Sequence, residues 1–66
     1  MPKYVVGQTY PAVLFGGEQR NFTVEEIGAV FYGIRWDDGS EEWAYEKDID
    51  CWVEAAREKE EEEKYS

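Results

Sequence analysis

The sequence predicts a mostly β protein: a small antiparallel sheet of four to five strands, closed into a barrel or strongly curled, with a short C-terminal helix. Three observations predict this fold. Apolar and aromatic residues alternate with polar ones through residues 31–45. An Asp-Gly step, the strongest short-range hairpin signal, divides that stretch at positions 38 and 39. From residue 49 onward, apolar residues recur at helical spacing.

The Asp-Gly step predicts the register of the last hairpin, provided that it fills the two central positions of a two-residue turn. Ile34 then pairs with Trp43, and Arg35 pairs with Glu42. One face of the hairpin becomes apolar, and the other carries an opposite-charge pair. The apolar face would contain Tyr32, Ile34, Trp43 and Tyr45.

Shorter apolar runs predict the earlier strands. Residues 4–6 are expected at a sheet edge, and residues 10–15 and 22–27 are expected to form strands. A three-residue loop after the second strand would place Phe22 opposite Ile34 and Val24 opposite Tyr32. These four side chains would then share one face of the sheet.

A helix is predicted to begin near Cys51, with Asp50 as its N-cap. Cys51 itself is expected to be a small buried hydrophobe. Four glutamates at positions 60–63 lie at the end of the helix where the macrodipole disfavours negative charge. We therefore expect a single domain over residues 1–59 and an acidic tail over residues 60–66 that frays. The residues expected to close one end of the sheet are Ile49, Trp52, Val53 and Ala56.

Length and charge limit the kinds of partner. A chain of 66 residues forms one domain, and 17% aromatic residues supply its core. The net charge is −9, and residues 1–50, with 10 acidic and 4 basic residues, carry −6 of it. The folded part is therefore acidic without the tail. This charge disfavours nucleic acids and anionic membranes and favours a basic partner.

The residues that most enzymes use are missing or badly placed. The chain has no histidine and one cysteine, which excludes a Ser-His or Cys-His pair, an internal disulfide and a zinc site. Neighbouring carboxylates such as Glu41 and Glu42 point to opposite faces of a strand and cannot act on one bond. We expect a protein that is not an enzyme and has no cofactor or metal. The lone cysteine and the short first apolar run predict a cytoplasmic location.

The rings that flank the two main loops are the candidate ligand site. Phe15 and Phe22 flank the first long loop, and Trp36 and Trp43 flank the Asp-Gly turn. If both loops lie at one end of the sheet, the four rings form an aromatic rim with nearby carboxylates, which can hold a cation. The other interpretation is that these rings are core, above all Phe22 and Trp43, because so small a domain needs most of its aromatic residues inside.

Residues 31–50 resemble the second half of a Tudor-type domain, a member of the SH3-like barrel group. The resemblance rests on the run Tyr-Gly-Ile-Arg-Trp-Asp-Asp-Gly-Ser at positions 32–40, on Trp43 and on the Lys-Asp-Ile run at positions 47–49. It implies an SH3-like barrel. It also implies, by position, a methyl-lysine cage made of Phe15, Phe22, Trp36 and Trp43.

We expect a non-catalytic acidic module that docks a basic protein surface or peptide. One alternative is a small inhibitor, of the kind phages make, that blocks a nucleic-acid-binding host protein by acidic charge mimicry. A structural subunit of a larger assembly is a third interpretation. A concave aromatic rim would favour the docking module. A row of carboxylates without a pocket would favour the inhibitor, and an exposed apolar patch would favour the structural subunit. The predicted contact residues are Trp36 as aromatic anchor with Asp37, Asp38, Glu41 and Glu42.

Overall fold

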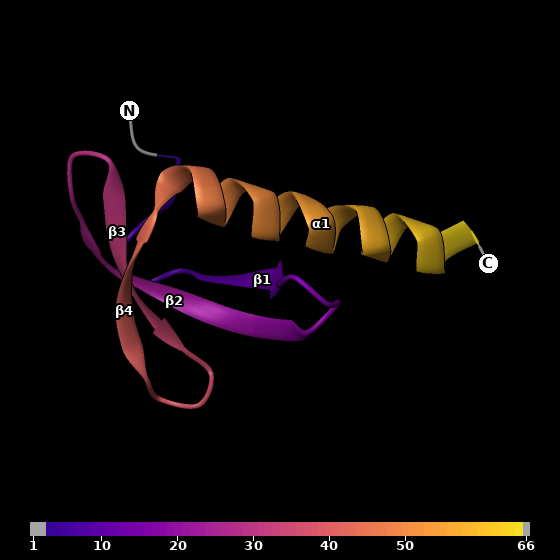
Figure 1. Cartoon of the computed structure of the whole chain (residues 1–66), viewed down its shortest axis with the longest axis horizontal. Coiled ribbons are helices and arrows are strands. Elements are labelled where there is room, and N and C mark those ends of the chain that lie inside the picture. Colours follow the sequence, from indigo (N-terminus) through magenta and orange to yellow (C-terminus); the bar gives the residue numbers. More distant parts are fainter. Residues whose placement is uncertain (1–2, 66) are drawn as a thin grey trace.

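A computed structural model describes residues 3–65, and the side chains of residues 3–60. One antiparallel sheet and one helix make up this part of the chain (Figure 1). The sheet is open, because β1 and β4 are its two edges within residues 3–65. The mostly β fold with a C-terminal helix is confirmed, whereas the sheet is not closed into a barrel. In order, the elements are β1 (Thr9–Val13), β2 (Gln19–Ile27), β3 (Phe31–Trp36), β4 (Glu41–Tyr45) and α1 (Glu46–Tyr65).

The register of the β3–β4 hairpin differs from the prediction by one residue. Gly33 pairs with Trp43, and Ile34 pairs with Glu42, so the predicted pairs Ile34–Trp43 and Arg35–Glu42 are wrong. Because side chains alternate along a strand, the shift moves Trp43 to the face opposite Ile34. Ile34 is fully buried, whereas Trp43 is 56% exposed, so the interpretation of Trp43 as a core residue is also wrong.

The cause of this shift is a turn of three residues in place of two. The N–H of Trp36 donates to the carbonyl of Ser40 at 2.7 Å, and the N–H of Gly39 donates to the carbonyl of Trp36 at 2.9 Å. Gly39 has a φ of 93°, while no non-glycine residue described has a positive φ. A two-residue type I′ turn would need positive φ at both Asp38 and Gly39, so the chain forms the longer turn, which ends in a left-handed glycine.

The β2–β3 pairing also differs from the prediction, but the shared face is correct. Phe22 pairs with Trp36, and Val24 with Ile34, so the predicted partners Ile34 and Tyr32 are wrong by two residues. A bulge at residue 25 then shifts the register of the rest of the ladder. Phe22, Val24, Tyr32 and Ile34 are nevertheless all buried on the inner face, as alternation predicted.

The helix covers the inner face of the sheet and runs beside β1 (Figure 1). It begins at Glu46, directly after β4 and five residues before the predicted start, with acidic residues in its first turn. The exposed side chain of Cys51 contradicts the prediction that it is buried. The helix continues to Tyr65, and fraying of residues 60–66 stays a prediction. As predicted, the side chains that pack toward the sheet include Ile49, Trp52, Val53 and Ala56.

The N-terminal segment closes the core without forming a strand. Tyr4 is buried, and its ring makes edge contacts with Tyr10 at 5.2 Å and Tyr32 at 5.3 Å. Its hydroxyl donates to Asp50 at 2.5 Å, and the ammonium of Lys3 donates to the same carboxylate at 2.9 Å. Asp50 therefore lies inside α1 and ties the N-terminal segment to the helix, which corrects the prediction of Asp50 as an N-cap.

Candidate functional site

Trp36, the predicted anchor, lies in the core beside the β3–β4 turn. It is 7% exposed, and its ring packs against Phe22 at 5.9 Å and Trp52 at 5.3 Å. The indole N–H donates to a carboxylate oxygen of Glu42 at 2.7 Å. The ring and its donor are thus both engaged within the chain, so the structure does not present Trp36 to a partner.

The two aspartates of the turn are engaged as well. Arg20 reaches across from β2 and lies 3.2 Å from Asp37 and 2.9 Å from Asp38. Hydrogen bonds from the hydroxyl and N–H of Ser40, together with the Arg20 guanidinium, hold the pKa of Asp38 far below its usual value. Arg20 also stacks over the Trp36 ring at 5.1 Å. These contacts order the turn and cancel part of its charge.

The structure does not bring the four rings of the predicted rim together. Phe22 and Trp36 are in contact, but both are buried on the inner face of the sheet. Trp43 lies on the outer face, and Phe15 stands in the β1–β2 turn with 97% of its surface exposed.

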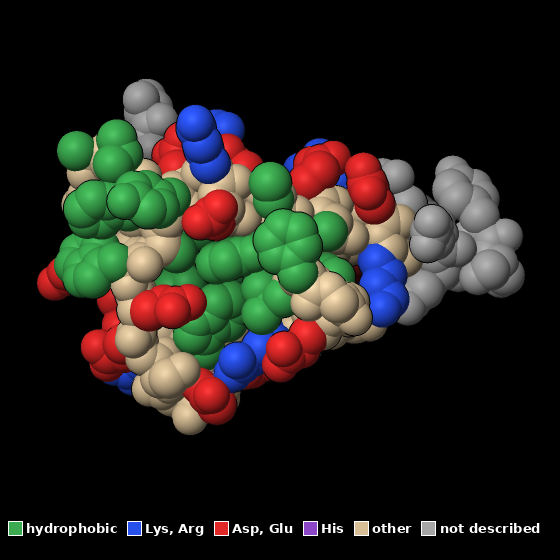
Figure 2. All heavy atoms as spheres, in the orientation of Figure 1, with side chains coloured by type: hydrophobic (Ala, Val, Ile, Leu, Met, Phe, Trp, Pro, Cys, Tyr) green, Lys and Arg blue, Asp and Glu red, His purple; other side chains and the backbone are tan. Residues whose placement is uncertain are grey.

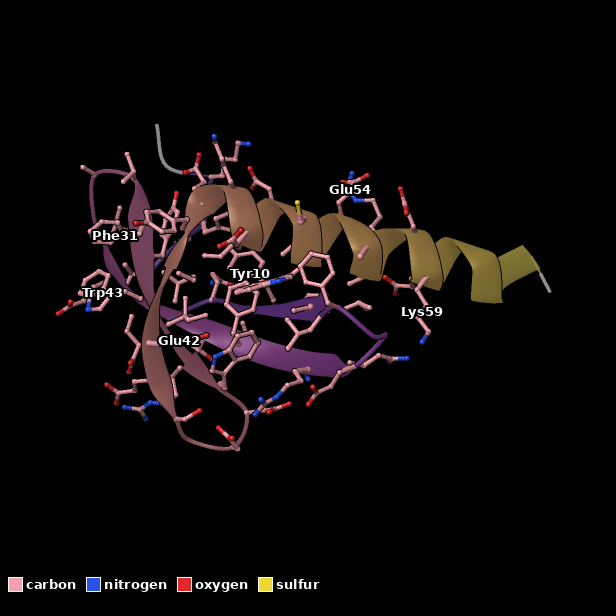
Figure 3. The ribbon with its side chains drawn as sticks, in the orientation of Figure 1. Tyr10, Phe31, Glu42, Trp43, Glu54 and Lys59 are labelled. Atoms are coloured by element: carbon pink, nitrogen blue, oxygen red, sulfur yellow. The ribbon has the colours of Figure 1, made fainter. Side chains whose placement is uncertain are left out.

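Three other rings form an exposed cluster on the outer face of β3 and β4. Phe31 packs edge-on against Trp43 at 5.4 Å and against Tyr45 at 5.8 Å. The three side chains are 37%, 56% and 59% exposed, respectively. Phe31 and Trp43 project from the side of the sheet away from α1 (Figure 3), where Figure 2 shows a hydrophobic patch. We call Phe31, Trp43 and Tyr45 the outer aromatic patch.

Gly33 allows the Trp43 indole to approach the sheet closely. A Cβ at Gly33 would stand 3.4 Å from two carbons of the Trp43 ring and 3.4 Å from the Cβ of Glu26. An aromatic residue that covers a cross-strand glycine in this way protects the bare backbone. Sequence reasoning missed this site, although an isolated glycine within a strand is a signal for close approach of another group.

Beside the Trp43 ring, the outer face is hollowed and acidic. Arg35 is the basic residue beside this hollow, paired with Glu25 at 3.0 Å and with Glu41 at 2.9 Å. Three carboxylates, those of Glu25, Glu26 and Glu41, thus share the outer face with one guanidinium, and Glu26 has no cationic partner among the described side chains. The Glu42 side chain points to the inner face, where it accepts the indole N–H of Trp36, so Glu42 lines the hollow with its backbone. We call this the acidic hollow, and its lining residues are Glu25, Glu26, Gly33, Ile34, Glu41, Glu42 and Trp43.

The carboxylates of the acidic hollow come from two strands, β2 and β4. Among residues 3–60, no group of three or more cysteine, aspartate or glutamate side chains is close enough to hold a metal ion. They act on a ligand as a distributed negative field beside an exposed aromatic surface, which is an arrangement suited to a cation.

In the part of the chain that the structure describes, no helix is both long and apolar enough to cross a membrane. Comparison with protein-family models, with curated proteins and with solved structures finds nothing that matches this chain. The resemblance of residues 31–50 to a Tudor-type domain therefore stays a prediction.

Proposed function

We propose that this chain is a non-catalytic binding module that docks a basic segment of a partner protein on its outer face. The observation that carries the proposal is the exposed Trp43 ring on the same face as three glutamates (Glu25, Glu26 and Glu41) and one arginine. A lysine or arginine side chain placed over this ring gains cation–π attraction and the field of the carboxylates together. Tryptophan is also among the residues most enriched at binding hot spots.

The contact surface differs from the one that the sequence predicted. Glu41 belongs to both surfaces, whereas the Glu42 side chain is held on the inner face by Trp36, and Trp43 replaces Trp36 as the aromatic anchor. Asp37 and Asp38 pair with Arg20, and Asp38 also accepts hydrogen bonds within the turn, so we expect both to contribute less to the binding of a partner. The net charge of −9 accelerates the encounter with a basic partner over a range that shrinks as salt is added.

The outer aromatic patch favours a protein partner over charge mimicry, and the carboxylates beside it favour a basic docking segment over the apolar contact of a structural subunit. An inhibitor that imitates a nucleic acid is expected to present a spaced row of carboxylates without a pocket. Here the acidic hollow is bordered by Trp43, and Phe31 and Tyr45 continue the apolar surface. This combination supports recognition of a side chain with both a cationic end and an apolar stem, as lysine and arginine have.

The proposal is tested with a fluorescent octapeptide of alternating lysine and valine, titrated at low and high salt by anisotropy. Glu26→Lys should weaken binding several-fold more than Glu58→Lys, a matched charge reversal in the half of α1 that extends away from β4 (Figure 1). Trp43→Ala should weaken binding, whereas Phe15→Ala, which removes another exposed ring, should not. Equal effects of the two charge reversals, with no effect of Trp43→Ala, would show that only net charge attracts the peptide.

A further inference from the structure

The free edge of β4 has unpaired backbone groups next to the outer aromatic patch. Hydrogen bonds join Trp36 to Ser40 at one end of the β3–β4 ladder and Glu46 to Val30 at the other. Hydrogen-bonded pairs alternate along an antiparallel ladder, so Glu42 and Ala44 direct their N–H and C=O groups toward β3. The backbone groups that face away from β3 are therefore those of Glu41, Trp43 and Tyr45.

The two edges of the sheet are protected differently. β1 has Pro11 at its centre, and α1 packs along it. Proline on an edge strand is a common means of blocking further strand pairing. β4, with the sequence Glu-Glu-Trp-Ala-Tyr, has neither proline nor lysine, and its pairing with β3 has no bulge. Within residues 3–65, no other strand pairs with its free side.

We propose that the basic segment of the partner binds as an extended strand, antiparallel to β4, and becomes the fifth strand of the sheet. This inference rests on the proposed function and specifies how the segment is recognised. The partner residue opposite Trp43 exchanges two backbone hydrogen bonds with it and projects its side chain on the same face as the indole. A lysine or arginine there lies across the Trp43 ring, with its cation toward the acidic hollow. Basic residues are thus read at every second position.

Charge decides between a basic segment and a second copy of this chain. Pairing of two β4 strands would bring Glu41 and Glu42 of each copy to one interface between two chains that each carry −9. Like charges across a strand pair are destabilising, and chains of the same strong charge repel each other. A basic strand gains from the same carboxylates, so it is the occupant that this edge favours.

The test compares the lysine–valine octapeptide with two forms that carry backbone N-methyl groups, either on the lysines or on the valines. Lysines over the outer face have their N–H groups directed at β4, whereas the N–H groups of the valines point to solvent. Methylation of the lysines should weaken binding about 10-fold or more, because the hydrogen bonds that these N–H groups donate to β4 are lost. Methylation of the valines should have little effect, and exchange of the Trp43 amide hydrogen should slow when the unmodified peptide binds.

The outcomes separate this inference from the proposed function. If the unmodified peptide binds through Trp43 but both methylated forms bind equally well, or Trp43 amide exchange is unchanged, strand addition is wrong and the docking function stands. If the unmodified peptide does not bind even at low salt, the proposed function fails, and strand addition fails with it.

Discussion

The indole ring of Trp43 lies over Gly33 of the neighbouring strand, with two ring carbons 3.4 Å from the point where a Gly33 Cβ would stand. The absence of a side chain on β3 therefore shapes the exposed aromatic surface on β4. Gly33 pairs directly with Trp43 in the ladder, so no other residue of β3 could provide this space.

Replacement of Gly33 by valine should separate stability from binding. The branched side chain would lift the Trp43 ring from the sheet, and the affinity for the basic peptide should fall several-fold. Stability should not fall, because valine is favoured in strands over glycine. Urea melts and peptide titrations of Gly33→Val and Gly33→Ala check this, since the alanine Cβ would make only ordinary contacts. An unchanged affinity in Gly33→Val would show that the close approach of the Trp43 ring to β3 is unimportant.

Removal of the Trp43 side chain should cost little stability compared with removal of a core ring. Trp43 is 56% exposed, whereas Phe22 is 1% exposed beneath α1. Phe22→Ala should lower the free energy of unfolding by about 3–5 kcal/mol, and Trp43→Ala by about 1 kcal/mol. Ile34→Val, with an expected loss of about 0.5–1.5 kcal/mol, gives a core measurement if Phe22→Ala does not fold. A larger loss for Trp43→Ala than for Ile34→Val by more than about 2 kcal/mol would place Trp43 in the core after all.

Gly39 should be the glycine of the β3–β4 hairpin that tolerates substitution least. Its φ of 93° lies in the left-handed region, which side chains disfavour. Gly39→Ala should lower the free energy of unfolding by about 1 kcal/mol. Gly33→Ala is the control, since Gly33 has no positive φ. Equal stability of the two variants in denaturant melts would contradict the three-residue turn.

The contacts of Asp50 predict a defined pH dependence of stability. Burial alone would raise the pKa of Asp50, but hydrogen bonds from Tyr4 and Lys3 and the Lys3 charge bring it below the usual 3.8. A carboxyl whose pKa is lowered on folding adds stability that is complete above the unfolded value of 3.8. That stability is lost as the pH falls through the lower, folded pKa.

Asp50→Asn should therefore be less stable than the parent chain at neutral pH, and the difference should shrink as the pH falls below about 3.8. Urea melts of both proteins across this range measure the difference. Comparison of the two proteins removes the effect of the many other carboxylates, which titrate in both. A difference that stays constant from neutral to strongly acidic pH would show that the charge of Asp50 contributes nothing.

Particular residues show what the sequence could and could not predict. Phe22, Val24, Tyr32 and Ile34 were correctly placed on one buried face, because alternation survives a register error of two residues. The hairpin register was wrong by one, since an Asp-Gly step fits turns of two or three residues. The contacts that hold Asp38 come partly from Arg20, which is distant in the sequence.

The one-residue error in the β3–β4 register also led to the wrong aromatic residue as the candidate anchor. A register shift of one position exchanges the faces of all residues in a strand, so Trp43 and Tyr45 lie on the outer face and not on the predicted inner face. Trp36 was predicted as the exposed anchor because it borders the turn, but its pairing with Phe22 directs it into the core. Alternation alone could not reveal this, because it depends on the register between two strands.

The central claim, that the outer aromatic patch and not the hairpin turn binds the partner, is tested most directly by the indole N–H signals in NMR spectra. The three tryptophans lie in three different places: Trp36 in the core, Trp43 on the outer face and Trp52 on α1. Titration with the lysine–valine peptide should shift the Trp43 signal strongly and leave those of Trp36 and Trp52 nearly unchanged. A shift confined to Trp36, or no shift of Trp43 at saturating peptide, would contradict the account.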